Sequence, residues 1–65
     1  MNTYITDIQN NGELIILSDF SKWKVSSFDA FNTRMWMRMD NVVAENSALI
    51  NTSRRNEKVS ATRAF

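Results

Sequence analysis

The sequence predicts an all-β fold, a small barrel of five or six short antiparallel strands with one short helical or 3₁₀ turn. Short runs rich in β-branched and aromatic residues recur along the whole chain. Turn-forming residues separate these runs at intervals of roughly eight to twelve residues, which is typical of small sandwiches and barrels. No apolar pattern of helical period is long enough for an independent helix, so helical bundles are excluded.

The length of the chain allows one domain, which we place at residues 1–65. A chain of 65 residues buries only about 60% of its unfolded surface when it folds. Hydrophobic residues make up 43% of the sequence and charged residues 23%, a balance typical of globular proteins rather than disordered chains. One small core is therefore expected, with no second domain.

The first expected element is a hairpin over residues 3–17. Its first strand, TYITDI, is rich in Thr, Tyr and Ile and runs into NNG, where Asn11 and Gly12 suit the positive φ angles of a hairpin turn. The second strand, ELIILS, is an unbroken apolar run. Such a run predicts a central strand that meets protein on both faces.

A second hairpin is expected to turn at SDFS and to continue into KWKV. Ser and Asp side chains bond to nearby backbone amides and so favour turns. The alternation in KWKV places Trp23 and Val25 on one face and Lys22 and Lys24 on the other. The apolar face of this strand is expected to meet the core.

The second half of the chain predicts one helical turn and three more strands. In SSFDAFNTR, Ser27 can cap a helical segment over residues 27–32, with Asp29 in its first turn. Three β-like runs follow: NVVAEN, ALINTS and KVSATRA. The polar segment SRRNE, between the last two runs, is typical of a hairpin tip.

The order GELIILSDFSKWKV, FDAF, MWMRMDNVV, ALIN and KVSA resembles a group of small bacterial SH3-like β-barrel domains. Their pattern has a Gly-led strand, a Leu-x-Asp-Gly-Ser-x-Trp-x-Val hairpin, a second Trp followed by Gly-Asp and a Val-rich strand, and a closing Leu-x-Asn hairpin. The resemblance covers residues 5–62. It implies an SH3-like barrel with Trp23 and Trp36 in the core, and it implies no biochemical activity.

Two turn glycines of this pattern are replaced by bulky apolar residues. Phe20 stands where the pattern has the glycine of Asp-Gly-Ser, and Met39 where it has the glycine of Gly-Asp. A residue other than glycine at positive φ costs about 1 kcal/mol or more. If both loops keep their course, Phe20 and Met39 lie at the surface.

The segment RMWMRMD, residues 34–40, combines three methionines with a tryptophan and two arginines. Read as a strand, it places Met35, Met37 and Met39 on one face and Arg34, Trp36 and Arg38 on the other. Read as a helix, it aligns Phe31, Met35 and Met39. A barrel that holds two tryptophans has little room for three methionines, so at least one is expected at the surface, where methionines suit adaptable partner contacts.

The residue types present exclude most familiar active sites. The sequence contains no cysteine and no histidine, which removes disulfides, the usual zinc sites, thiol nucleophiles and imidazole bases. The aspartates are scattered, and no pair has the spacing of a carboxylate dyad or a metal loop. We therefore expect no enzyme, no catalytic residues, no metal and no cofactor.

Two functions of different class remain. The first is a non-catalytic module that binds a protein partner or a second copy of itself through exposed aromatic and methionine side chains. Its candidate surface consists of Phe20, Met35, Met37 and Met39, with Arg34 and Arg38 as a polar rim and Phe28 and Phe31 as further rings. The alternative is a barrel that binds RNA or single-stranded DNA through Lys22, Lys24, Arg54, Arg55 and Lys58.

Charge and hydropathy indicate where the protein works. The net charge of +1 provides no overall field toward nucleic acid or a membrane surface. The N-terminal segment lacks the basic opening and apolar run of a signal peptide, and no segment has the roughly 18 apolar residues of a membrane helix. We expect a cytoplasmic protein without a membrane partner; a secreted or periplasmic origin stays open if a signal peptide was removed.

Overall fold

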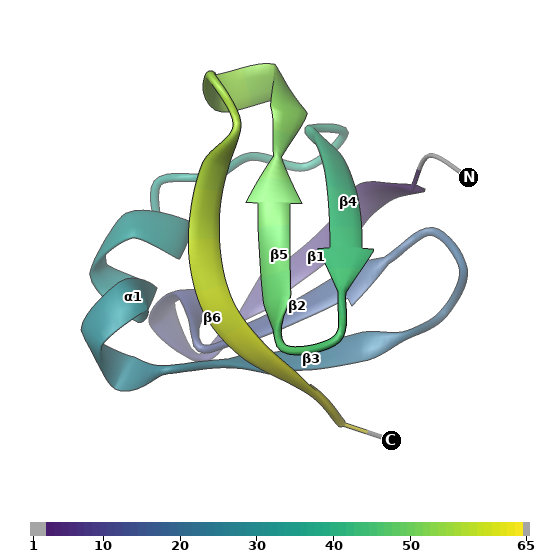
Figure 1. The fold of residues 1–65 in the computed structure, drawn as a ribbon. Helices are drawn as coiled ribbons and strands as arrows, with labels where there is room; N and C mark the ends of the chain where they lie inside the picture. The colour runs from purple at the N-terminus through teal and green to yellow at the C-terminus, as the bar shows by residue number, and fades with distance from the viewer. Residues whose placement is uncertain (1–2, 65) are drawn as a thin grey trace.

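The computed structural model describes residues 3–64, whose strands close into a six-stranded antiparallel barrel with one short helix (Figure 1). The strands are β1 (Thr3–Gln9), β2 (Leu14–Leu17), β3 (Lys22–Val25), β4 (Asn41–Glu45), β5 (Ala48–Asn51) and β6 (Glu57–Ala64). Their order around the barrel is β1-β2-β3-β6-β5-β4. Among them lie η1 (Asn10–Gly12), α1 (Ser27–Thr33) and η2 (Thr52–Arg54). The predicted all-β barrel is confirmed.

Alternate residues of the strands fill the barrel. On β3, Trp23 and Val25 are buried while Lys22 and Lys24 are exposed, as the alternation predicts. Trp36 enters the same core from the segment before β4, and only 3% of its surface is exposed. The buried cluster consists of Ile5, Ile15, Leu17, Trp23, Val25, Trp36, Val42, Leu49, Val59 and Ala61. Both tryptophans are core residues, as expected.

The first hairpin is present, with a longer turn than a two-residue loop. Gln9 pairs with Leu14, so four residues connect β1 to β2. Asn10, Asn11 and Gly12 all have positive φ angles, of 53°, 56° and 93°. Asparagine tolerates this region better than most residues because its short side chain bonds locally. The predicted positive φ at the Asn-Gly pair is confirmed.

The outer face of β2 corrects one expectation. Ile15 and Leu17 are buried in the core, whereas Leu14 and Ile16 are only half-buried on the other face. The cross-strand neighbours of these two residues are lysines of β3, and lysine stems can cover apolar surface while the charge stays in water. The outward-facing apolar residues of β2 are therefore partly covered by neighbouring side chains, and no second layer of protein from residues 3–64 packs on that face.

Helix α1 ends one residue later than expected and has a different cap. The hydroxyl of Ser26, rather than Ser27, accepts a hydrogen bond from the Phe28 amide, at 3.4 Å. Thr33 is fully buried, and its hydroxyl donates to the carbonyl oxygen of Gly12 in η1. This contact holds the end of α1 against the β1–β2 turn.

Residues 34–40, called the connector below, form neither a strand nor a helix. The connector runs alongside β1: the Met39 amide donates to the Ile5 carbonyl at 2.8 Å, and the Ile5 amide donates to the Asp40 carbonyl at 3.0 Å. Trp36 turns inward and donates its indole N–H to Glu57. The strand and the helix predicted for residues 34–40 were both wrong. The connector consists of consecutive turns, which direct Trp36 into the core while its methionines stay outside.

Candidate protein interaction surface

All three methionines of the connector face solvent. Met35, Met37 and Met39 are 64%, 62% and 69% exposed. In the middle of the connector, Arg38 forms an ion pair with Asp7 of β1 at 3.1 Å, which ties the connector to the barrel wall. The expectation of at least one exposed methionine is confirmed, and the connector, which runs alongside β1, exposes three flexible apolar side chains.

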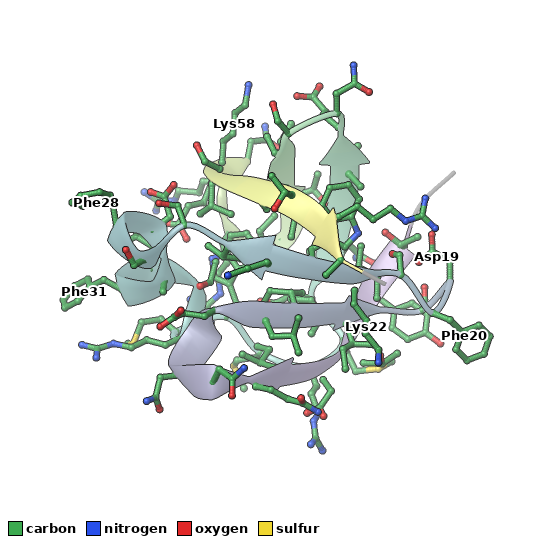
Figure 2. The ribbon with its side chains drawn as sticks, turned by 90° about the horizontal axis from the view of Figure 1, so that it is seen from below. Asp19, Phe20, Lys22, Phe28, Phe31 and Lys58 are labelled. Carbon is green, nitrogen blue, oxygen red and sulfur yellow. The ribbon has the colours of Figure 1, made fainter. Side chains whose placement is uncertain are left out.

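Phe20 lies at the tip of the β2–β3 hairpin and projects away from the barrel (Figure 2). It has a φ of 69° and is 89% exposed. The turn is held by the Phe20 amide, which donates to the Leu17 carbonyl at 3.0 Å, and by Asp19, whose carboxylate accepts from the Ser21 amide at 3.1 Å. Met39 has a φ of 76°. Both residues occupy glycine-like backbone positions and are exposed, as expected.

Three neighbouring segments bring apolar side chains to this end of the barrel. The Ser18 amide donates to the Tyr4 carbonyl at 2.8 Å, which joins the Phe20 turn to the start of β1. On its other side Tyr4 pairs with Asn41, just after the Met39 turn. Tyr4 itself is 40% exposed. We call Tyr4, Phe20 and Met39 the hairpin-end surface.

Phe28 and Phe31 do not join the hairpin-end surface. They lie on α1, which follows β3, whereas Phe20 lies just before β3. Figure 2 shows the two rings of α1 on one side of the molecule and Phe20 on the other. The guanidinium of Arg34 stacks over the Phe31 ring at 4.4 Å from its centre. The aromatic residues expected to form one surface are therefore divided between two regions.

A hollow lies where η1 meets the connector, at the Gln9 end of β1. We call it the η1 hollow; it is open to solvent, measures about 560 Å³, and is lined by Ile8, Asn11, Gly12, Arg34, Met35 and Trp36. Sequence reasoning did not find it, because its walls come from three separate segments. The one sequence feature that indicates this hollow is Gly12, the single glycine of the chain. Because glycine has no side chain, the η1 backbone can approach the connector closely.

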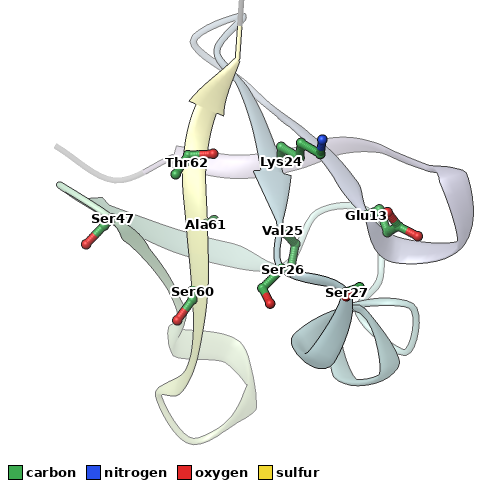
Figure 3. Close-up of a pocket in the computed structure, with 9 residues that line it drawn as sticks. All are labelled: Glu13, Lys24, Val25, Ser26, Ser27, Ser47, Ser60, Ala61 and Thr62. Carbon is green, nitrogen blue, oxygen red and sulfur yellow. The ribbon is translucent and has the colours of Figure 1, made fainter.

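A second open hollow, of about 610 Å³, lies between β3, β6 and the start of α1 (Figure 3). Its lining is rich in serine and threonine hydroxyls around one lysine, Lys24. Of these groups, the Ser26 hydroxyl caps α1 and the Ser60 amide donates to Asp29 at 2.8 Å. The bond between Ser60 and Asp29 fastens α1 to β6 along one wall of this hollow.

The basic residues of the alternative nucleic-acid hypothesis are spread over the barrel. Lys22 and Lys24 project from β3, while Arg54, Arg55 and Lys58 lie at or next to η2. Figure 2 shows Lys22 and Lys58 far apart. Arg54 pairs with Asp40 at 3.0 Å, and Lys58 with Glu45 at 3.6 Å. The structure does not bring these five residues into one groove.

The last residue of the connector, Asp40, is fixed by three neighbours. Its Oδ2 atom accepts hydrogen bonds from the Asn51 side chain at 3.0 Å, the Met37 amide at 3.1 Å and Arg54 at 3.0 Å. Burial raises the pKa of Asp40, but these bonds outweigh it and hold the pKa below its ordinary value of 3.8. The carboxylate therefore anchors the methionine-bearing segment to β5 and η2.

We expect the barrel to lose stability in acid. The pKa values of Asp7, Asp19 and Asp40 are all lower in the folded chain than their ordinary 3.8. The unfolded chain therefore binds protons more readily, so the stabilisation is complete well above 3.8 and is lost as the pH falls through the lower folded values. Urea unfolding at about pH 7 and about pH 3 measures this loss. Asp40→Asn should reduce the difference, and an unchanged difference would contradict the role of Asp40.

Two further features bear on function. Across residues 3–64, no three acidic side chains lie close enough together to share a metal ion. In the same residues no helix is long and apolar enough to cross a membrane.

The fold and surface define a small closed antiparallel β-barrel that exposes phenylalanine and methionine side chains. Comparisons with protein-family models, with curated proteins and with solved structures give no match. Any functional conclusion therefore depends on the surface itself.

Proposed function

We propose that this barrel is a non-catalytic interaction module that associates with a second copy of itself through the connector and the hairpin-end surface. The observation that carries the proposal is the pair of positive φ angles at Phe20 and Met39. Each residue accepts about 1 kcal/mol of backbone strain relative to glycine. Each is also exposed, at 89% and 69%, so neither gains compensating burial within its own barrel.

The surroundings of these two residues suit a protein contact. Met37, whose amide bonds to Asp40, adds a flexible, polarizable side chain that can adapt to a partner. The ion pair of Arg38 with Asp7 borders the methionines, as polar rims border apolar contact surfaces. An apolar surface with a polar rim is expected for protein association rather than for phosphate binding.

A second copy is the partner that the size of the chain favours. A domain of 65 residues has a small core, and chains of this size commonly gain stability by association. The SH3-like architecture implied by the sequence pattern fits such a module. We also propose that the chain has no catalytic activity of its own, because its hydroxyls and lysines lack a histidine or thiol partner.

The test is sedimentation of the wild type and of the double variant Phe20→Gly with Met39→Gly over a wide concentration range. The wild type should associate as concentration rises, and the double variant should stay monomeric. Its stability should be unchanged or higher by up to about 1 kcal/mol per site, because glycine relieves the strain but gains freedom in the unfolded chain.

A matched control separates this surface from general stickiness. Phe28 is 90% exposed and lies away from the hairpin-end surface, so Phe28→Ser should associate like the wild type. A wild type that remains monomeric throughout, or a double-glycine variant that unfolds, would contradict the proposal. Binding to single-stranded DNA that weakens steeply with salt and survives the glycine substitutions would favour the nucleic-acid alternative.

A further inference from the structure

We propose that the copies associate head to tail, with Phe20 of one copy inserted into the η1 hollow of the next. This inference rests on the proposed self-association and adds its geometry. It requires a projecting group at one end of the barrel, a matching recess at the other, and polar groups that pair when the two meet. The described residues provide all three.

The projecting group is the tip of the β2–β3 hairpin. Phe20 stands out from the barrel, and Asp19 precedes it in the same turn (Figure 2). The Oδ1 atom of Asp19 accepts from the amide and hydroxyl of Ser21, and these bonds lower the pKa of the carboxyl. No other residue of 3–64 donates a hydrogen bond to its Oδ2 atom, and the charge of Arg63 also lowers its pKa. The tip therefore offers a phenyl ring beside a carboxylate that is charged at neutral pH and has one oxygen free.

The recess has the complementary chemistry. Ile8, Met35 and Trp36 give the η1 hollow an apolar lining, and Arg34 adds a positive charge to its wall. The guanidinium carbon of Arg34 lies over the Phe31 ring, 4.4 Å from the ring centre. Within the described part of the chain, it forms no ion pair. A stacked guanidinium keeps its in-plane N–H groups available, so it can donate to a carboxylate while it remains over the ring.

The tip and the hollow also match in the order of their residues along the chain. In the tip, the carboxylate and the ring belong to consecutive residues, Asp19 and Phe20. In the recess, the cation and an apolar wall also belong to consecutive residues, Arg34 and Met35. A ring that enters the hollow beside Met35 therefore brings the adjacent carboxylate toward the guanidinium. A charged hydrogen bond of this kind is roughly twice as strong as a neutral one.

The positions of tip and recess make the contact heterologous. The η1 hollow lies at the Gln9 end of β1, whereas Phe20 lies beyond the Tyr4 end. A strand of seven residues separates these ends by roughly 20 Å, so one copy cannot fill its own hollow. Each copy then uses its tip on one neighbour and its hollow on another. Such a contact extends into an open chain unless the rotation closes a ring.

Two complementary variants test this geometry. Phe20→Gly removes the tip and keeps the hollow, while Met35→Glu places a charge in the hollow and keeps the tip. Met35 is 64% exposed, so its substitution should leave the fold intact. Each variant alone should sediment as a monomer, because each lacks one half of the contact. Their equimolar mixture should form a 1:1 dimer and nothing larger, while the wild type should grow beyond dimers with concentration.

Arg34→Glu serves as a second hollow variant, and it replaces Met35→Glu if that chain does not fold. Repulsion from Asp19 should weaken association by about tenfold or more. If both hollow variants associate like the wild type, or if the wild type stops at a closed dimer, the head-to-tail contact is wrong and the proposed self-association stands. If the wild type does not associate, both proposals fail.

Discussion

Replacing Trp23 by alanine is expected to unfold the domain at room temperature. The indole is 6% exposed within the core cluster, and its N–H donates to the Ser21 hydroxyl at 3.0 Å. Truncation of a buried tryptophan costs about 3 to 5 kcal/mol. A domain this small is stable by little more than that. The same substitution also removes a bond that supports the turn carrying Phe20.

Circular dichroism and amide NMR spectra measure this result directly. Lys24→Ala is the matched control, because Lys24 is the next residue on β3 and is exposed, so the folded spectrum should persist. Trp23→Phe should keep a folded but weakened domain, since it retains most of the apolar volume. A dispersed, native-like spectrum for Trp23→Ala would contradict the barrel core described above.

Gly12→Ala is expected to lower the free energy of unfolding by about 3 kcal/mol or more. Gly12 has a φ of 93°, a conformation that residues with a Cβ atom rarely adopt. A Cβ atom at this position would lie 2.5 Å from the Arg34 nitrogen and 2.8 Å from the Ala30 carbonyl oxygen. Both are backbone atoms, so the end of α1 and the start of the connector would have to move together.

Urea unfolding of Gly12→Ala and of a neighbouring control measures the effect. Asn11 also has a positive φ, of 56°, but it is exposed, so Asn11→Gly should change stability little. Because Gly12 lines the η1 hollow, any Gly12→Ala protein that still folds should also associate less. Stability equal to that of the wild type would show that the contact between η1 and α1 is looser than described.

Local chemistry made much of the fold predictable. The Asn-Gly turn, the alternation around Trp23 and the polar tip before β6 each depend on neighbours in the chain, and each appears in the structure. The exposure of Phe20 and Met39 followed from the resemblance, in which both residues stand at turn glycines.

The candidate surface was only partly predictable, because it depends on contacts between segments that are far apart in the sequence. Sequence patterns predict either a strand or a helix for the connector, and only its contacts with β1 and the burial of Trp36 place its methionines at the surface. The separation of Phe28 from Phe20 likewise depends on the course of β3 through the barrel. The wide separation of the basic residues on β3 from those around η2 was also unpredictable, because sequence patterns carry no information about such distances.

Periodicity and the φ preferences of single residues were enough to predict most strands and turns and the inward face of Trp23. The burial of Trp36 was implied only by the resemblance, since its own segment has no regular period. Only the tertiary structure decided which exposed side chains share a surface. The η1 hollow arises where Gly12, α1 and the connector pack together. It lies at the other end of β1 from Phe20 because β1, β2 and β3 pair antiparallel in sequence order. Closure sets the spatial order of the strands through hydrogen bonds between distant segments, and no local pattern specifies that order.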